Sequence, residues 1–375
     1  MLEITENRSS FSDSELARMV KRDNNSKRNY LIVDSIQGKH IPAVPADVLK
    51  LFSELAGQLK NEYENQKIIF IGFAETATAV GAGVACCFEG SYYIHTTREV
   101  DNDAIPVVQF KEEHSHAVEQ LLYCDNWNQI SSQADRIVFV EDEITTGKTI
   151  LNFVNELIRN KKVKPEMKFS ACSILNGMTD ERKKEMSDNG LDFFWLVRLH
   201  ATPDSDCVYT FDEESHCRKQ QNYKLIKTDG RINPRFGTDT SAYIDACRKL
   251  SQKIINKIDA DNKKIAVIGT EECMFPAIFT GAEIMKKTSA VYVRTHSTTR
   301  SPIVAETTDG YPLRSRYQVE SLYESDRRTF IYNSDDKYDL VIIVTDTNKS
   351  DICIERLMSA FSGCSEFILV KWGET

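Results

Sequence analysis

Residues 137–149, IVFVEDEITTGKT, are the segment from which the fold of this chain is most readily predicted. Apolar residues lead into two acids, and a run rich in Thr and Gly then opens the helical pattern TILNFVNELI. A strand that delivers charge to a phosphate-sized turn is typical of parallel α/β folds, where ligands lie at the carboxyl ends of the strands. The acids can accept hydrogen bonds from vicinal sugar hydroxyls, and amides at the helix start can hold a phosphate.

The TGKT end of this segment also occurs in the P-loops of nucleoside-triphosphate enzymes. A P-loop requires Gly five residues before the Gly of its Gly-Lys pair. That position is Asp142 in this chain. The sequence therefore excludes a simple P-loop ATPase or GTPase.

Strand and helix patterns alternate along the rest of the chain. Short runs rich in β-branched and aromatic residues, each followed by helical periodicity, lie at 31–36, 67–73, 91–95, 136–142, 169–175 and 192–198. This alternation predicts an α/β fold with a mainly parallel sheet. A polar stretch at 211–240 interrupts the pattern, which restarts at 263. We therefore expect two domains, residues 1–225 and residues 226–375.

Composition and charge narrow the class of protein. The 47 Lys and Arg against 56 Asp and Glu give a net charge of −9, which disfavours binding to nucleic acid. The first residues are acidic where a signal peptide is basic, and no run approaches the roughly 18 apolar residues of a membrane span. We expect a cytoplasmic protein without membrane contact. Its ten cysteines lack metal-site or disulfide spacing, so we expect reduced thiols.

The 137–149 segment resembles the phosphoribosyl pyrophosphate motif of the type I phosphoribosyltransferases. Only Glu143 departs from that pattern, which usually has an apolar residue or Ser there. The resemblance implies that Glu141 and Asp142 bind the ribose hydroxyls. It also implies that the 5′-phosphate is held by Thr145, Thr146, Gly147, Lys148 and Thr149.

Two upstream segments fit the same resemblance. IIFIGFAETATAVGAGVA, residues 68–85, matches the place of the pyrophosphate loop, with Glu75, Thr76 and Ala77 as candidates, although any tight turn between a strand and a helix can read this way. SYYIHTTREV, residues 91–100, brings Arg98 to the same sheet edge. There its guanidinium either pairs with pyrophosphate oxygens or remains a surface side chain.

Residues 101–122 occupy the position of the flexible catalytic loop in orotate-type members of the family. Glu113, His114 and His116 are candidates for contacts with substrate or pyrophosphate in that loop. A metal site here lacks a third ligand at a recognisable spacing, so we assign no metal-ligating residues. We expect residues 101–116 to become ordered when the ligand binds.

The whole chain resembles a bacterial branch of these proteins with a carboxyl-terminal TRSP domain, known from tellurium-resistance and stress gene clusters. The resemblance rests on GKHIPAVP at 38–45, INPRFG at 232–237 and the tetrapeptide TRSP at 299–302. In the second domain it singles out Arg300 and Ser301, for another ligand or for the first domain.

The resemblance implies an enzyme, a phosphoribosyltransferase. The expected reaction is Mg²⁺-dependent transfer of phosphoribose from phosphoribosyl pyrophosphate to a nucleobase or base-like heterocycle, or its reverse, with Glu141, Asp142 and Arg98 in catalytic roles. The alternative is a sensor or scaffold in a stress response that binds phosphoribosyl pyrophosphate or a nucleotide without turnover. A homodimer is compatible with either function.

The second half of the chain also reads as a degenerate copy of the first. Gly72 and Glu75 have counterparts in Gly269 and Glu272, and Asp142 aligns with Asp346. The alternative is that any two strand and helix units share such patterns. A true copy would have the same strand order, without the phosphate loop, which is replaced by NKSD at 348–351.

Overall fold

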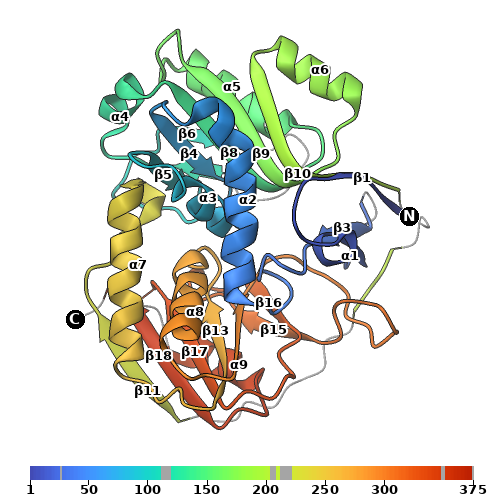
Figure 1. The fold of residues 1–375 in the computed structure, drawn as a ribbon, viewed down its shortest axis with the longest axis vertical. Helices are drawn as coiled ribbons and strands as arrows, with labels where there is room; N and C mark the ends of the chain where they lie inside the picture. The colour runs from blue at the N-terminus through green and yellow to red at the C-terminus, as the bar shows by residue number, and fades with distance from the viewer. Residues whose placement is uncertain (26–27, 111–119, 203–207, 212–221, 348–350, 374–375) are drawn as a thin grey trace.

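The computed structural model describes residues 1–375 except 26–27, 111–119, 203–207, 212–221, 348–350 and 374–375. Two α/β units lie one above the other in Figure 1, the first half of the chain in the upper unit and the second half in the lower. Helix α2 (Pro45–Tyr63) runs from one unit to the other. The mixed α/β fold with a largely parallel sheet is the one that the sequence predicts.

In the described part of the chain, the first sheet has seven strands in the order β1-β10-β9-β8-β4-β5-β12. The inner strands are parallel, and the edge strands β1 and β12 are antiparallel to their neighbours. The strands are β1 (Leu2–Asn7), β4 (Ile68–Gly72), β5 (Tyr92–His95), β8 (Arg136–Ile144), β9 (Lys168–Asn176), β10 (Leu191–Ala201) and β12 (Thr238–Asp239).

Two antiparallel hairpins accompany this sheet, β2 (Arg18–Lys21) with β3 (Tyr30–Val33) and β6 (Val108–Phe110) with β7 (Gln120–Leu122). The apolar run at 31–36 therefore contributes to a hairpin and not to the parallel sheet. A short connection joins it to the preceding strand, and only antiparallel pairing is possible across such a connection.

The second sheet has five parallel strands among the described residues, in the order β11-β18-β17-β13-β14. They are β11 (Tyr223–Thr228), β13 (Lys264–Gly269), β14 (Tyr292–Ser297), β17 (Leu340–Thr345) and β18 (Glu366–Trp372), with a separate hairpin of β15 (Arg316–Glu320) and β16 (Arg328–Tyr332). The expected domain boundary at residue 225 falls inside β11. We propose that the second domain begins before Tyr223, because β11 pairs with β18.

Helices cover both sheets and connect their strands. They are α1 (Asp13–Leu16), α3 (Thr78–Ala85), α4 (Trp127–Gln133), α5 (Lys148–Arg159), α6 (Asp180–Asp188), α7 (Thr240–Ile255), α8 (Phe275–Lys287) and α9 (Asp351–Ser359), with a 3-10 turn at Pro234–Phe236. No helix in the described ranges is long and apolar enough to cross a membrane.

The two sheets repeat the same strand order. The sequence β9-β8-β4-β5 in the first sheet corresponds to β18-β17-β13-β14 in the second, and all of these strands are parallel. The register agrees as well, because Gly72 pairs with Val140 as Gly269 pairs with Val344. The strand order predicted for a degenerate copy is therefore confirmed.

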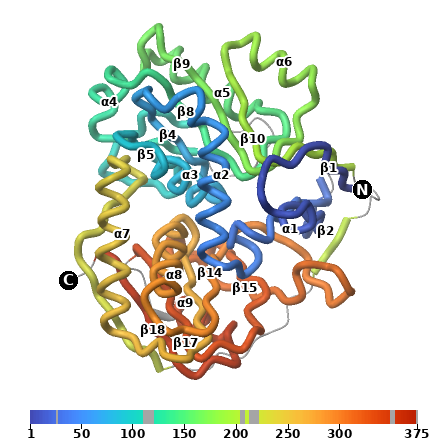
Figure 2. Tube along the Cα trace, in the orientation of Figure 1, coloured from blue at the N-terminus to red at the C-terminus, as the bar shows by residue number. Residues whose placement is uncertain are grey.

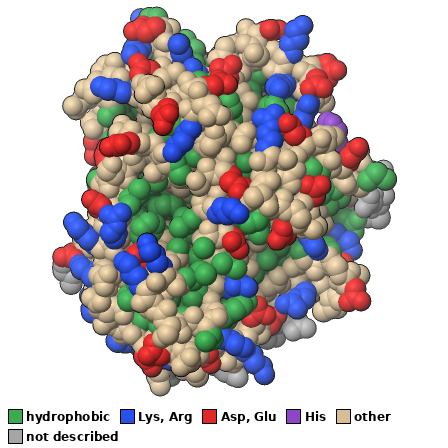
Figure 3. All heavy atoms as spheres, viewed as in Figure 1, with side chains coloured by type: hydrophobic (Ala, Val, Ile, Leu, Met, Phe, Trp, Pro, Cys, Tyr) green, Lys and Arg blue, Asp and Glu red, His purple; other side chains and the backbone are tan. Residues whose placement is uncertain are grey.

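The two units share one hydrophobic core. Buried side chains of α2, such as Phe52, belong to the same cluster as Ile265 of β13 and Phe275 of α8. Helices α2, α3 and α8 lie side by side where the units meet, as Figure 2 shows. Side chains of both charges are interspersed over the face seen in Figure 3, and this face therefore lacks the one-sign basic surface typical of nucleic-acid binding.

Candidate functional site

The carboxyl end of β8 brings Asp142 to the edge of the first sheet. Its side chain is half-buried, and Oδ1 accepts a hydrogen bond of 2.9 Å from Thr76 Oγ1. Burial raises the pKa of Asp142, and the hydrogen bond from Thr76 opposes that shift. The neighbouring Glu141 is also half-buried. Asp142 therefore contacts the candidate pyrophosphate loop, and the binding of ribose hydroxyls by Glu141 and Asp142 stays a prediction.

Glu143, the one departure from the expected motif, has a structural partner. Its carboxylate forms a 2.6 Å ion pair with Arg28, on the segment just before β3. Burial raises the pKa of Glu143, and Arg28 opposes the shift. Glu143 thus ties the acid-bearing strand to the amino-terminal hairpin.

The candidate phosphate loop follows β8 and opens helix α5 at Lys148. Gly147 has a φ of +67°, a conformation that favours glycine, and a Cβ there would lie 3.1 Å from Phe193 Cζ. The side chains of Thr145 and Thr146 are exposed. The N–H groups of residues 145–147 and 149 donate to no described residue, so they are available to an anion at the helix start.

The candidate pyrophosphate loop follows β4. The Ala74–Glu75 peptide is cis, and the Ala74 N–H donates to Thr96 Oγ1 at 2.9 Å. Thr76 is half-buried, while Ala77 is buried and its N–H donates to the Phe73 carbonyl at 3.1 Å. The N–H groups of Glu75 and Thr76 donate to no described residue. Of the three predicted candidates, Thr76 is therefore the one that contacts Asp142 through its side chain and also has an N–H without an acceptor among the described residues.

Glu75 has a different environment from the one expected of a ligand-binding group. Its carboxylate is buried and accepts hydrogen bonds of 2.8 Å from Thr299 Oγ1 and from the Arg300 N–H, both in the second domain. Lys39 Nζ lies 3.2 Å from the same oxygen. Burial alone would raise the pKa of Glu75, but Lys39 and Arg300 outweigh it and hold that pKa at about 2. Glu75 is thus a charged anchor for the loop.

Lys39 is a site residue that the sequence analysis missed. Its side chain is fully buried, and Nζ also donates to the Thr298 carbonyl at 3.2 Å. The signal was present, since Lys39 is a charged residue within the GKHIPAVP segment, which served only as a mark of resemblance.

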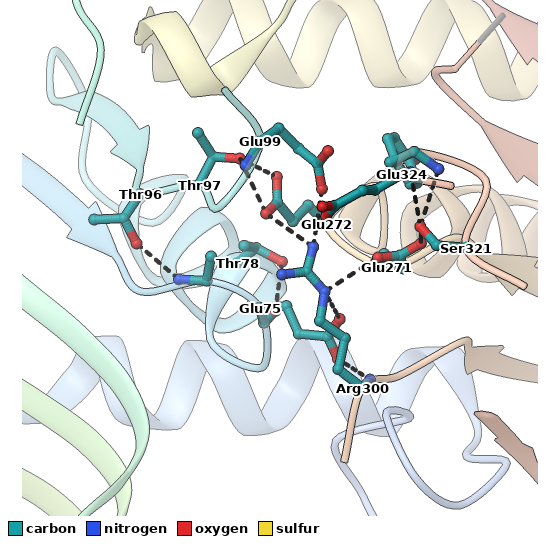
Figure 4. A network of polar contacts seen from close by, with 12 residues as sticks. Glu75, Thr78, Thr96, Thr97, Glu99, Glu271, Glu272, Arg300, Ser321 and Glu324 are labelled. Atoms are coloured by element: carbon teal, nitrogen blue, oxygen red, sulfur yellow. Dashed lines mark hydrogen bonds and ion pairs between the residues drawn. The ribbon is translucent and has the colours of Figure 1, made fainter. Parts of the chain in front are cut away.

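Arg98 and Arg300 end in contrasting environments. Arg98 lies three residues beyond β5, half-buried, and forms no ion pair or hydrogen bond with any described residue. Arg300 is enclosed by carboxylates, with Glu271 at 3.1 Å and Glu99 at 3.0 Å, as Figure 4 shows. Arg98 therefore has the uncommitted guanidinium, which is what pairing with pyrophosphate requires.

Among the described residues, Ser301 forms hydrogen bonds only through its backbone. Its N–H donates to Thr299 Oγ1 at 3.1 Å, and its carbonyl accepts from Tyr332 Oη at 2.6 Å. The other predicted loop residues, Glu113, His114 and His116, lie outside the described residues. Within the described ranges, no group of three His, Cys, Asp or Glu side chains is arranged to hold a metal ion.

The counterpart of Asp142 in the second unit, Asp346, is bound by side chains of its own unit. Asp346 lies in a cleft of about 490 Å³, where it accepts from Arg235 Nη1 at 2.6 Å and from Tyr323 Oη at 2.5 Å. Burial alone would raise the pKa of Asp346, but Arg235 and Arg231 outweigh it and lower that pKa to about 2. The Asp346 carboxylate therefore forms ion pairs within the protein, with Arg231 and Arg235.

The sheet order, the acids at the end of β8 and the two loops together define a phosphoribosyltransferase fold. Residues 16–198 match the family model described as phosphoribosyl transferase. Residues 233–361 match the model described as the TRSP domain C-terminal to that family. The chain belongs to the phosphoribosyltransferases that carry a TRSP domain, and it is an enzyme of that class.

Solved structures of phosphoribosyltransferases resemble part of the chain. Adenine phosphoribosyltransferase from Giardia lamblia, complexed with 9-deazaadenine, is 14% identical over 50% of this chain and 95% of that chain, with a TM-score of 0.33. Orotate phosphoribosyltransferase from Aeropyrum pernix is 16% identical over 49% and 88%, with a TM-score of 0.29. Likenesses of this size do not indicate a substrate. No curated protein matches the chain.

Proposed function

We propose that this enzyme transfers phosphoribose between phosphoribosyl pyrophosphate and a nucleobase or base-like heterocycle, with Mg²⁺, in one or both directions. The observation that carries the proposal is the meeting of two loops at one sheet edge, where Thr76 Oγ1 of the pyrophosphate loop donates to Asp142 at 2.9 Å. A pyrophosphate at Thr76 and a ribose at Asp142 would then be adjacent, as they are in phosphoribosyl pyrophosphate.

Different residues would bind different parts of phosphoribosyl pyrophosphate. The carboxylates of Glu141 and Asp142 would accept hydrogen bonds from the ribose hydroxyls, and the amides of residues 145–149 would hold the 5′-phosphate. The Thr76 N–H and the Arg98 guanidinium would bind the pyrophosphate. Each group holds a different part of one molecule, so the C1′ carbon is fixed for attack.

In the transfer, a ring nitrogen of the base forms a bond to C1′ while the C1′–O bond to pyrophosphate breaks, the electron pair leaves with the pyrophosphate, and the proton that the base loses passes to the solvent. Positive charge develops on the ribose in the transition state, near the two carboxylates. Negative charge develops on the leaving group, near Arg98 and the loop amides. The protein therefore accelerates the step through orientation and electrostatic stabilisation.

Mg²⁺, when bound, would neutralise charge on the pyrophosphate. The site fits such an ion, because Glu141 and Asp142 offer the carboxylate oxygens that Mg²⁺ prefers, and Mg²⁺ is usually held by one or two carboxylates together with substrate phosphates. The resemblance to proteins of stress gene clusters supports a nucleoside-like or nucleotide product.

The test is a product screen of the full chain with phosphoribosyl pyrophosphate, Mg²⁺ and a panel of nucleobases, read by mass spectrometry and paired with calorimetry. We expect a base-dependent nucleotide product and release of pyrophosphate. Asp142→Asn should weaken binding of phosphoribosyl pyrophosphate by about 1–3 kcal/mol, the contribution of a charged hydrogen bond. Asp188→Asn, an exposed residue at the end of α6, is the matched control and should bind as the wild type does.

Three outcomes separate the alternatives. A product that depends on Asp142 supports the transferase. Binding of phosphoribosyl pyrophosphate without any product from the panel supports the sensor or scaffold, a function that the second unit makes physically reasonable, since it retains the fold with its acid Asp346 tied up. Absence of phosphoribosyl pyrophosphate binding by the wild type refutes the transferase and a sensor of phosphoribosyl pyrophosphate, and calorimetry with a nucleotide then tests the nucleotide-binding form of the alternative.

A further inference from the structure

We infer that Thr299 and Arg300, the first two residues of the TRSP tetrapeptide, are positioning residues for the pyrophosphate loop of the first domain, which they hold through Glu75. The second domain thereby takes the place that a partner subunit has in a twofold dimer. The kinetic consequences of this inference rest on the proposed function, whereas the contact itself does not.

Strand register identifies the equivalent residues of the two units. Gly72 pairs with His95, and Gly269 pairs with Ser297. Counting on from each pair, Thr97 corresponds to Thr299, Arg98 to Arg300 and, within the loops after β4 and β13, Glu75 to Glu272. These equivalences come from the backbone alone.

Local hydrogen bonds repeat at the equivalent positions. The Ala74 N–H donates to Thr96 Oγ1 at 2.9 Å, and the Glu271 N–H donates to Thr298 Oγ1 at 2.9 Å. Each strand end is thus tied to its own loop in the same way. The two units therefore keep the same local construction, although their sequences have diverged.

The contacts between the units are reciprocal. Thr299 Oγ1 of the second unit donates to Glu75 of the first at 2.8 Å, and Thr97 Oγ1 of the first donates to Glu272 of the second at 2.9 Å. Figure 4 shows both glutamates in this network, on either side of Arg300. An interface in which the same patch is used twice, each residue contacting the other's equivalent, is the signature of twofold association.

The backbone repeats this reciprocity. Ala43, two residues before helix α2, forms a bridge with Thr295 of β14 in the other unit. Thr238, two residues before helix α7, pairs with Tyr93 of β5 in the other unit. Register makes Tyr93 and Thr295 equivalent as well. The pseudo-twofold relation therefore extends over the whole junction of the units.

The symmetry is broken where it affects the candidate site. In the second unit, Glu272 is bound by Arg235 of the same unit at 2.7 Å, next to the neutralised Asp346. In the first unit, Glu75 also has a cation of its own unit, Lys39 at 3.2 Å, but it receives in addition two 2.8 Å hydrogen bonds and the 3.3 Å approach of the Arg300 guanidinium from the other unit. Among the described residues, Glu272 receives hydrogen bonds from the other unit only through the Thr97 hydroxyl, whereas Glu75 is bound by a hydroxyl, a backbone N–H and a guanidinium of the other unit.

The contacts of Glu75 affect the candidate site because Glu75 is the chain neighbour of Thr76. It directly precedes Thr76, whose hydroxyl donates to Asp142 and whose N–H is available to a ligand. Because Glu75 is buried, its carboxylate has no water to replace a lost partner. Loss of the Thr299 hydroxyl should therefore loosen the loop that binds pyrophosphate.

The test compares Thr299→Val with its symmetry equivalent, Thr97→Val. The two hydroxyls are matched, since both are buried, both donate to a buried glutamate and both accept the N–H two residues on, at 3.1 Å and 3.0 Å. We expect similar drops in melting temperature. Only Thr299→Val should raise the KM for phosphoribosyl pyrophosphate, by roughly tenfold, with a smaller change in kcat.

Hydrogen exchange of residues 73–78 in the protein without ligand gives a readout independent of turnover. Exchange should be faster in Thr299→Val than in Thr97→Val, and Arg300→Lys, which keeps the charge and the backbone N–H, should fall between wild type and Arg300→Gln. Equal exchange and equal KM in the two threonine variants would overturn the inference. If the wild type neither binds nor converts phosphoribosyl pyrophosphate, the proposed function fails. The exchange comparison still decides whether Thr299 and Arg300 hold the loop through Glu75.

Discussion

Replacing Arg235 with Met should destabilise the protein more than removal of any surface charge. Arg235 is 8% exposed and forms ion pairs of 2.7 Å with Glu272 and 2.6 Å with Asp346, both of which are also buried. Methionine retains much of the packing volume but leaves two carboxylates without their cation. Breaking a buried pair in this way costs about 3–5 kcal/mol.

The loss should depend on pH with a defined sign. Arg235 is the main group that holds the pKa of Asp346 at about 2 against burial. In the variant, burial prevails and both carboxylates should bind protons in the folded state at higher pH than in the unfolded state. A folded state that binds more protons gains stability as the pH falls, so the penalty should be smaller at pH 5 than at pH 7.

Urea unfolding of the full chain at pH 7 and at pH 5 measures both effects. Arg248→Met is the control, because Arg248 pairs with Asp245 on the exposed side of α7 and its loss should change stability by about 0.5 kcal/mol or less. The triple variant Arg235→Met, Glu272→Gln, Asp346→Asn should recover much of the loss. A loss below about 1 kcal/mol at pH 7, or one that does not shrink at pH 5, would refute the argument.

Three further predictions concern the loop and buried titratable groups. Gly147→Ala should destabilise the protein by roughly 1–2 kcal/mol in thermal unfolding and weaken binding of phosphoribosyl pyrophosphate in calorimetry, because φ is +67° and Phe193 lies close; unchanged affinity would contradict it. Burial raises the pKa of Asp34 from 3.8 to about 8, so the folded state holds a proton on this carboxyl that the unfolded state has lost. As the pH rises from 3.8 to about 8, the unfolding free energy of the wild type should therefore fall by about 1.4 kcal/mol per pH unit relative to that of Asp34→Asn. Parallel pH profiles of the two proteins in urea unfolding would exclude this. Burial lowers the pKa values of His40 and His296 from 6.5 to about 3, so only the unfolded state binds their protons and stability should fall as the pH drops below 6.5; a double Gln variant with the same acid profile would disprove the assignment.

The sequence by itself determined the fold class and indicated the acid pair and the candidate phosphate loop. These features are local, because a strand, the acids that follow it and the amides of the next helix are consecutive in the chain. The same holds for the strand order of the second unit, which the parallel between residues 72–75 and 269–272 predicted. Hydrophobic periodicity and short motifs are sufficient for features of this kind.

Only the tertiary structure decided what the charged residues do. The sequence indicated Glu75 as a ligand-binding residue and left Arg300 open between another ligand and the first domain, and the two residues contact each other across 225 positions of sequence. Lys39 was noted only as part of a segment that carries the resemblance, and it is the buried cation beside Glu75. Whether a charged side chain faces a ligand or another protein side chain depends on which distant segments fold against it. Burying a charge without an oppositely charged partner costs several kcal/mol of folding free energy, so buried charges are paired within the protein. For that physical reason, the sequence alone indicated where the chemistry lies, and only the fold revealed which side chains are committed to holding the two units together.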